Sequence, residues 1–214
     1  MTRWLIALLI VLIAAVLGLW ALGQARAPIG ETNALDYAAR PAALIVDVPR
    51  LDAALSTSPY VVSGGEARTV WIVGHRSCRP CESFLRATLD DLRAADADVR
   101  VAFFAPEDAS AEERSTLAEI GARRSWSTLR SWISASERDF YARTGFAPAT
   151  DPVRRAILEA GRRTRDEIEA VMAANGLMTV YPLVFWRGED GDWMVAAGDT
   201  ARSRNAVLAA AGAE

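Results

Sequence analysis

Two cysteines, Cys78 and Cys81, constrain the fold of this chain more than any other feature of its sequence. They are the only cysteines among the 214 residues. The segment before them, Thr69–Val73, has the composition of a β-strand, and the segment after them has apolar side chains at helical spacing. These side chains are Phe84, Leu85, Leu89 and Leu92. The chain is therefore expected to pass from a strand into a helix through the cysteine pair, and the apolar run Val99–Ala105 predicts a buried strand next.

A cysteine at the start of a helix has a defined chemistry. The unsatisfied amide groups and the helix dipole stabilise a thiolate there, and the thiolate is the nucleophile in disulfide exchange. Cys78 is therefore the predicted nucleophile. Cys81 lies one turn further on and is predicted to resolve a mixed disulfide formed on Cys78. Pro80 fits the first helical turn, where a missing N–H is tolerated.

Three basic or titratable residues surround the motif. Arg79 lies inside it, and His75 and Arg76 lie just before it. A positive charge on any of them lowers the pKa of Cys78. For His75, a solvated or backbone-bonded loop residue is an equal alternative, because a lone histidine need not be functional.

Two cysteines can also serve structural or metal-binding purposes. Buried structural cysteines are common, but the polar, proline-containing surroundings disfavour that interpretation. A structural zinc site needs four ligands, whereas the chain has two cysteines and one histidine. Binding of a soft metal such as copper(I) stays open as the alternative function.

The overall composition excludes further classes. A hydrophobic content of 51% can supply a core for one domain of ordinary size. The net charge of −3 and pI near 5.4 argue against a nucleic-acid-binding surface. Two cysteines three residues apart cannot form the disulfide framework of a small secreted domain.

The N-terminus predicts export. Residues Trp4–Leu22 carry no charged side chain, which is about the 20 residues that span a bilayer. A cleaved signal peptide is the alternative, with Ala25-Arg26-Ala27 or Gly23 as possible cleavage points, but its apolar region is usually only about 7–15 residues long. We therefore expect a retained anchor or signal sequence over residues 1–23, followed by a linker over 24–42.

An N-terminal extension is expected over residues 43–68. Ala43–Val48 reads as a short strand and Pro49–Leu55 as a short helix. Gly64-Gly65 lies between two β-branched runs, Tyr60–Ser63 and Thr69–Val73, and this pattern predicts a hairpin.

A helical insertion is expected over about residues 107–177. Ser110 with Glu113, and Thr164 with Glu167, have the spacing of capping boxes, and Asp151-Pro152 is a further helix start. Asn175-Gly176 is a typical helix end. The expected buried residues are Leu117, Ile120, Trp126, Leu129, Ile133, Ile168, Val171 and Met172. Two strands, Tyr181–Arg187 and Trp193–Ala197, and a helix, Thr200–Ala211, are expected to close the chain.

The Cys78-Arg79-Pro80-Cys81 motif after a strand, with Tyr181-Pro182 before a late strand, resembles the thioredoxin superfamily. The resemblance covers residues 69–214, and the helical insertion and N-terminal region are similar to those of periplasmic DsbC/DsbG-type proteins. It implies an α/β thioredoxin-like fold in which Pro182 follows a cis bond beside the cysteines, and in which the backbone next to it binds extended substrate. Ser77 replaces the tryptophan of thioredoxin, and Tyr181 replaces the smaller residue of the isomerases.

Together these features predict a membrane-anchored thiol–disulfide oxidoreductase of the cell envelope. It would oxidise, reduce or isomerise disulfides in exported proteins and would be recharged by a membrane redox partner. No cofactor and no metal are expected for this reaction. The expected location is the cytoplasmic membrane, with a single span and the domain on the outer side, because Arg3 and the amino terminus favour a cytoplasmic N-terminus.

Overall fold

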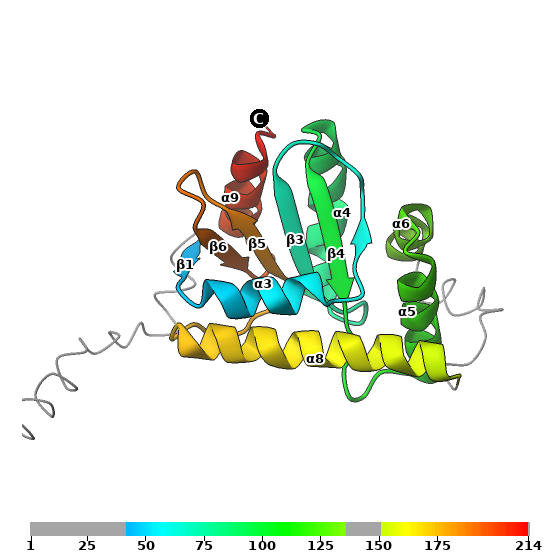
Figure 1. Ribbon diagram of the computed structural model, residues 1–214. Coiled ribbons are helices and arrows are strands. Elements are labelled where there is room, and N and C mark those ends of the chain that lie inside the picture. Colours follow the sequence, from blue (N-terminus) through cyan, green and yellow to red (C-terminus); the bar gives the residue numbers. More distant parts are fainter. Residues whose placement is uncertain (1–41, 136–150, 214) are drawn as a thin grey trace, which may run out of the picture. The chain divides into compact units, whose positions relative to one another are not determined.

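The computed structural model describes residues 42–135 and 151–213 (Figure 1). The apolar segment Trp4–Leu22 and nearly all of the predicted linker lie outside the described residues. Among the helices that are described, none combines the length and the apolar character needed to cross a membrane.

A six-stranded mixed sheet forms the centre of the described domain. Its strand order is β1-β6-β5-β3-β4-β2. The neighbours β3 and β4 are parallel, and the four other neighbouring pairs are antiparallel. The strand bounds are Ala43–Ile45 (β1), Val61–Val62 (β2), Thr69–Gly74 (β3), Asp98–Phe103 (β4), Leu183–Arg187 (β5) and Trp193–Ala197 (β6).

Helices cover both faces of the sheet. Figure 1 shows α3 and α8 in front of the strands and α4 and α9 behind them, with α5 and α6 beside the β2 edge of the sheet. The helix bounds are Val48–Ser56 (α3), Arg79–Ala94 (α4), Ala111–Arg123 (α5), Trp126–Ser134 (α6), Pro152–Ala174 (α8) and Ala201–Ala211 (α9). The structure therefore has α5, α6 and α8 between β4 and β5, in the region of the predicted insertion.

The alternation of side chains in the central strands divides the core in two. Val70 and Ile72 of β3 pack with α4, α6 and α9, whereas Trp71 and Val73 pack with α3 and α8. Successive residues of a strand point to opposite faces, so a strand covered on both sides is apolar throughout. Of the predicted inner residues of the insertion, all but the half-buried Trp126 are buried.

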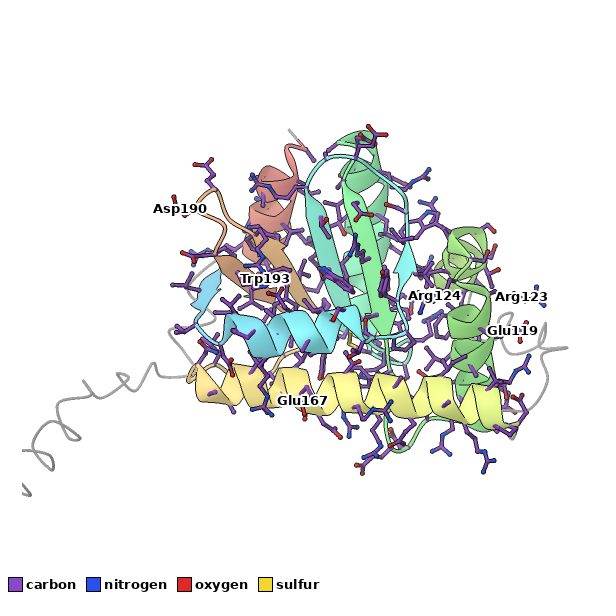
Figure 2. All side chains as sticks on the ribbon, viewed as in Figure 1. Glu119, Arg123, Arg124, Glu167, Asp190 and Trp193 are labelled. Atoms are coloured by element: carbon purple, nitrogen blue, oxygen red, sulfur yellow. A yellow bond between two sulfur atoms is a disulfide. The ribbon has the colours of Figure 1, made fainter. Side chains whose placement is uncertain are left out.

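Polar side chains begin and join the helices of the insertion. Asp151 accepts a hydrogen bond from the Arg154 amide at the start of α8, as predicted from Asp151-Pro152. Glu119 on α5 forms ion pairs with Arg154 of α8 and with Arg123 of its own helix, and Figure 2 shows Glu119 and Arg123 at this side of the domain. The Glu119–Arg154 ion pair joins α5 to the first turn of α8.

The predicted hairpin around Gly64-Gly65 is wrong. Strands β2 and β3 do not pair; β4 lies between them, antiparallel to β2 and parallel to β3. A Cβ atom on Gly65 would lie 2.3 Å from the carbonyl oxygen of Ala97, so this glycine allows a close approach of two backbones just before β4. The glycine pair therefore marks a crossing connection rather than a two-stranded turn.

The two predicted capping boxes also differ from the structure. Thr164 lies inside the continuous helix α8, where its hydroxyl donates to the Ala160 carbonyl, so no helix starts there. Ser110 does cap α5 by accepting from the Glu113 amide, but the Glu113 carboxylate bonds elsewhere. In a complete capping box the Glu113 carboxylate would accept a hydrogen bond from the Ser110 amide. Here it accepts hydrogen bonds from Ser77 instead.

Candidate active site

The cysteine pair lies where β3 passes into α4. Cys78 is the N-cap of α4, and its Sγ accepts a hydrogen bond from the Cys81 amide at 3.2 Å. The two residues form a disulfide with their Cα atoms 5.2 Å apart. Cys78 is half-buried, whereas Cys81 is fully buried inside the first turn of the helix. Cys78 is therefore the cysteine that a second protein can reach.

A glycine makes room for the buried sulfur. Gly74 is the last residue of β3, and a Cβ atom placed on it would lie 2.8 Å from the Cys81 Sγ. Pro80 occupies the first turn of α4, where no intrahelical N–H bond is lost. The end of the strand and the start of the helix thus pack directly around the disulfide.

The segment before β5 reaches the same place. The Tyr181-Pro182 bond is cis, as predicted, and the Tyr181 carbonyl oxygen lies 3.9 Å from the Cys78 Sγ. Because β5 pairs with β3, the start of β5 is held beside the end of β3. A strand–helix–strand unit with the cysteine pair therefore meets a strand–strand–helix unit with the cis proline.

The chain has a thioredoxin-like fold. No protein-family model matches the sequence, and no curated protein matches it significantly. Similar solved structures include BcfH of Salmonella enterica Typhimurium (16% identity, TM-score 0.44, 97% of this chain and 89% of that one). A second is a periplasmic thioredoxin-like protein of Salmonella enterica serovar Typhimurium (14% identity, TM-score 0.39, 78% of this chain and 96% of that one). A third is MdbA, a thiol-disulfide oxidoreductase of Corynebacterium diphtheriae (16% identity, TM-score 0.40, 68% of this chain and 83% of that one).

His75 forms part of the loop before Cys78 in this thioredoxin-like domain. Its Nδ1 lies 3.0 Å from the Ser77 Oγ, and its ring contacts Phe104 and Tyr181 with centroids 5.2 and 6.1 Å apart. Burial lowers the pKa of His75, and Asp108 opposes this shift only in part. The imidazole is therefore mainly neutral at pH 7, where it acts through hydrogen bonding and packing.

The two arginines of the motif region have different surroundings. Arg76 is buried, and its guanidinium donates to Glu82 at 2.6 Å and to the Ala135 carbonyl at 3.1 Å. Its charge is therefore neutralised within the fold. Arg79 is exposed at the first position of α4, and no carboxylate of the described residues forms an ion pair with it.

Glu113 is a site residue that the sequence analysis assigned to a different role. Its side chain comes from the first turn of α5 and is 2% exposed. The Oε1 atom accepts hydrogen bonds from the Ser77 amide at 3.1 Å and the Ser77 hydroxyl at 3.2 Å. Burial raises the pKa of Glu113, and the bonds from Ser77 oppose the shift. No local pattern in the sequence links residue 113 to residue 77.

Tyr181 is fixed from the side of α8. Its hydroxyl donates to Glu169 at 3.0 Å, and its ring lies 4.9 Å from that of Phe104. Burial, with Glu169 adding to it, raises the pKa of Tyr181, so the phenol stays neutral. The aromatic rings of His75, Phe104 and Tyr181 thus form one wall of the site.

Residues 42–135 and 151–213 contain no cluster of three or more histidine, cysteine, aspartate or glutamate side chains that could hold a metal ion. The two cysteines are joined to each other, and the single histidine bonds to a serine.

Proposed function

We propose that the protein is a thiol–disulfide oxidoreductase that exchanges disulfides with exported proteins. The observation that carries the proposal is the position of the Cys78 sulfur. It is accessible at the N-terminus of α4 and lies 3.9 Å from the carbonyl before cis Pro182, while its partner Cys81 is buried. Amide groups and the helix dipole at this position favour a thiolate.

In the reduced protein, the Cys78 thiolate attacks one sulfur of a client disulfide. A mixed disulfide forms, and the other client sulfur leaves as a thiolate that takes up a proton. Cys81 then loses its proton and attacks the Cys78 sulfur, which releases the second client thiol and restores the Cys78–Cys81 disulfide. Oxidation of a client is the same sequence in reverse, so no additional electron carrier is consumed within either exchange.

The backbone beside the proline supports recognition of an extended client. In the described part of the chain, the main-chain N–H and C=O of Tyr181 form no backbone hydrogen bond. Unpaired main-chain groups next to a strand are the groups that pair with an added extended peptide. The fixed ring of Tyr181 would then limit which client side chains fit beside Cys78.

A neighbouring groove favours acidic clients. It has a volume of about 580 Å³ and is lined by four arginines, Arg114, Arg155, Arg162 and Arg165, with two glutamates. The guanidinium of Arg165 also lies 5.8 Å from the centre of the Phe104 ring, so this side chain contacts both the groove and the aromatic wall. Arg155 is exposed and has no ion pair with a described carboxylate. The unpaired charge complements aspartate and glutamate side chains.

Trapping of clients tests the proposal. Cys81→Ala removes the resolving thiol, so the variant is expected to accumulate covalent adducts with exported proteins that dithiothreitol dissociates. Cys78→Ala, the matched control, is expected to trap none because its remaining thiol is buried. Equal trapping by both variants would reverse the assigned roles. Trapping by neither, with copper retained by the purified parent protein, would favour the copper(I)-binding alternative.

The membrane anchor is part of the same proposal and rests on the uncharged segment Trp4–Leu22. A full span is expected to keep the protein in the membrane fraction after carbonate washing, because its insertion is effectively irreversible. Release of a shorter protein whose N-terminus lies near Gln24 or Pro28 would identify a cleaved signal peptide instead.

A further inference from the structure

Glu113 connects the helical insertion to the loop that carries the nucleophile. It is the third residue of α5, and its own amide is held by the Ser110 cap at 3.1 Å. Its carboxylate then reaches Ser77, 36 residues earlier in the chain, through the amide and the hydroxyl. Ser77 directly precedes Cys78. A nearly buried carboxylate with two bonds to one residue restricts the position of that residue.

The loop around Ser77 is held by further bonds. The Cys78 amide donates to the His75 carbonyl at 3.3 Å, and the Ser77 hydroxyl lies 3.0 Å from the His75 Nδ1. His75, Ser77 and Cys78 therefore form one closed turn, and Glu113 anchors this turn to α5. Loss of the anchor would leave the Ser77 amide without its acceptor and free the residue before the nucleophile to move.

We propose that Glu113 is a positioning residue of the redox pair, which holds Ser77 in place and, through its negative charge, opposes formation of the Cys78 thiolate. This inference rests on the proposed function. The charged groups that act on Glu113 are Arg76, which attracts the carboxylate, and Asp108, which repels it. Arg76 is already paired with Glu82, so it does not cancel the charge of Glu113 completely.

Two substitutions separate the positioning effect from the charge effect. Glu113→Gln keeps an oxygen that can accept from Ser77 but removes the charge, whereas Glu113→Ala removes both. Each is made in the full-length Cys81→Ala protein, and alkylation of Cys78 by iodoacetamide is followed against pH. Both substitutions are expected to lower the alkylation midpoint by about 1 pH unit, because a nearby negative charge is lost.

Disulfide exchange with a model peptide then reports on positioning. In the protein with both cysteines, Glu113→Ala is expected to slow formation of the mixed disulfide about tenfold at a pH where Cys78 is fully ionised. Glu113→Gln is expected to stay within about twofold of the parent rate, because the acceptor for Ser77 is retained. Equal slowing by both variants would overturn the positioning role.

Glu119→Gln is the matched control. Glu119 is a nearly buried carboxylate on the same helix, but its partners are Arg123 and Arg154 rather than Ser77. This variant is expected to lower stability and leave the Cys78 midpoint unchanged. An unchanged midpoint in Glu113→Gln would overturn the inference even if Glu113→Ala failed to fold. The alkylation profile does not require client exchange, so it tests Glu113 separately from the proposed function.

Discussion

Replacing Gly74 by alanine tests how tightly the redox pair is packed against the end of β3. A methyl group there would lie 2.8 Å from the Cys81 Sγ and 3.4 Å from its Cβ. Non-bonded heavy atoms prefer separations of about 3.5–4.0 Å, so the methyl group and the sulfur would be too close by about 1 Å. Overpacking of this kind costs about 1–3 kcal/mol of unfolding free energy. A loss of 2 kcal/mol would change the folded-to-unfolded ratio about 30-fold.

The same substitution should also change the redox equilibrium. In the oxidised protein the Cys81 sulfur is held by its bond to Cys78, whereas in the reduced protein the thiol can turn away from the methyl group. If about 1.4 kcal/mol of the clash is relieved on reduction, the reduction potential rises by about 30 mV and the disulfide becomes a stronger oxidant.

Urea unfolding of both redox forms and equilibration with a glutathione buffer measure the two effects. Gly188→Ala is the matched control, because a Cβ atom at Gly188 would be in ordinary contact, 3.6 Å from its nearest neighbours. The control is expected to behave as the parent protein. A Gly74→Ala protein with the parent's urea midpoint and reduction potential would refute the packing argument.

Two further predictions concern charged side chains. The hydrogen bond from Arg154 holds the pKa of Glu119 below its usual value, so its stabilising effect is present above about pH 4.5 and is lost as the pH falls through the lowered pKa. Glu119→Gln is therefore expected to reduce the unfolding free energy by about 1–3 kcal/mol at pH 7 and by much less near pH 3; an equal loss at both values in urea titrations would contradict this origin. Arg155→Glu is expected to slow exchange with an acidic model peptide about threefold and to leave a neutral peptide unaffected. Arg93→Glu makes the same charge change at the far end of α4, and equal slowing by it would rule out a specific role for the groove.

The local signals in the sequence predicted much of the site. The spacing of apolar side chains changes from that of a strand to that of a helix around Cys78 and Cys81, and this change predicted both elements. The resemblance to the thioredoxin superfamily predicted that Pro182 lies beside the two cysteines. Both results depend on residues close in sequence or on a motif. The start of α8 at Asp151-Pro152 was equally predictable from the sequence, because a capping side chain bonds an amide only three residues away.

The errors came from interactions between distant segments. Gly64-Gly65 fits a hairpin turn, but β4 supplies the partner for both flanking strands, and strand pairing is decided by the whole sheet. Glu113 fits a capping box, but a carboxylate can bond any nearby amide, and the fold presents that of Ser77. Thr164 fits a helix start, but the buried residues before and after it continue one helix. Spacing alone cannot rank such competing partners.

The outermost strands of the sheet are both very short. Strands β1 and β2, at the two edges, contain three and two residues. A short edge offers few unpaired backbone groups to an incoming strand, so it is a poor template for intermolecular sheet growth. Under the proposed function, unfolded client proteins would expose the segments that could extend such an edge. The short edges would then let the domain exchange disulfides with these clients without adding their strands to its sheet.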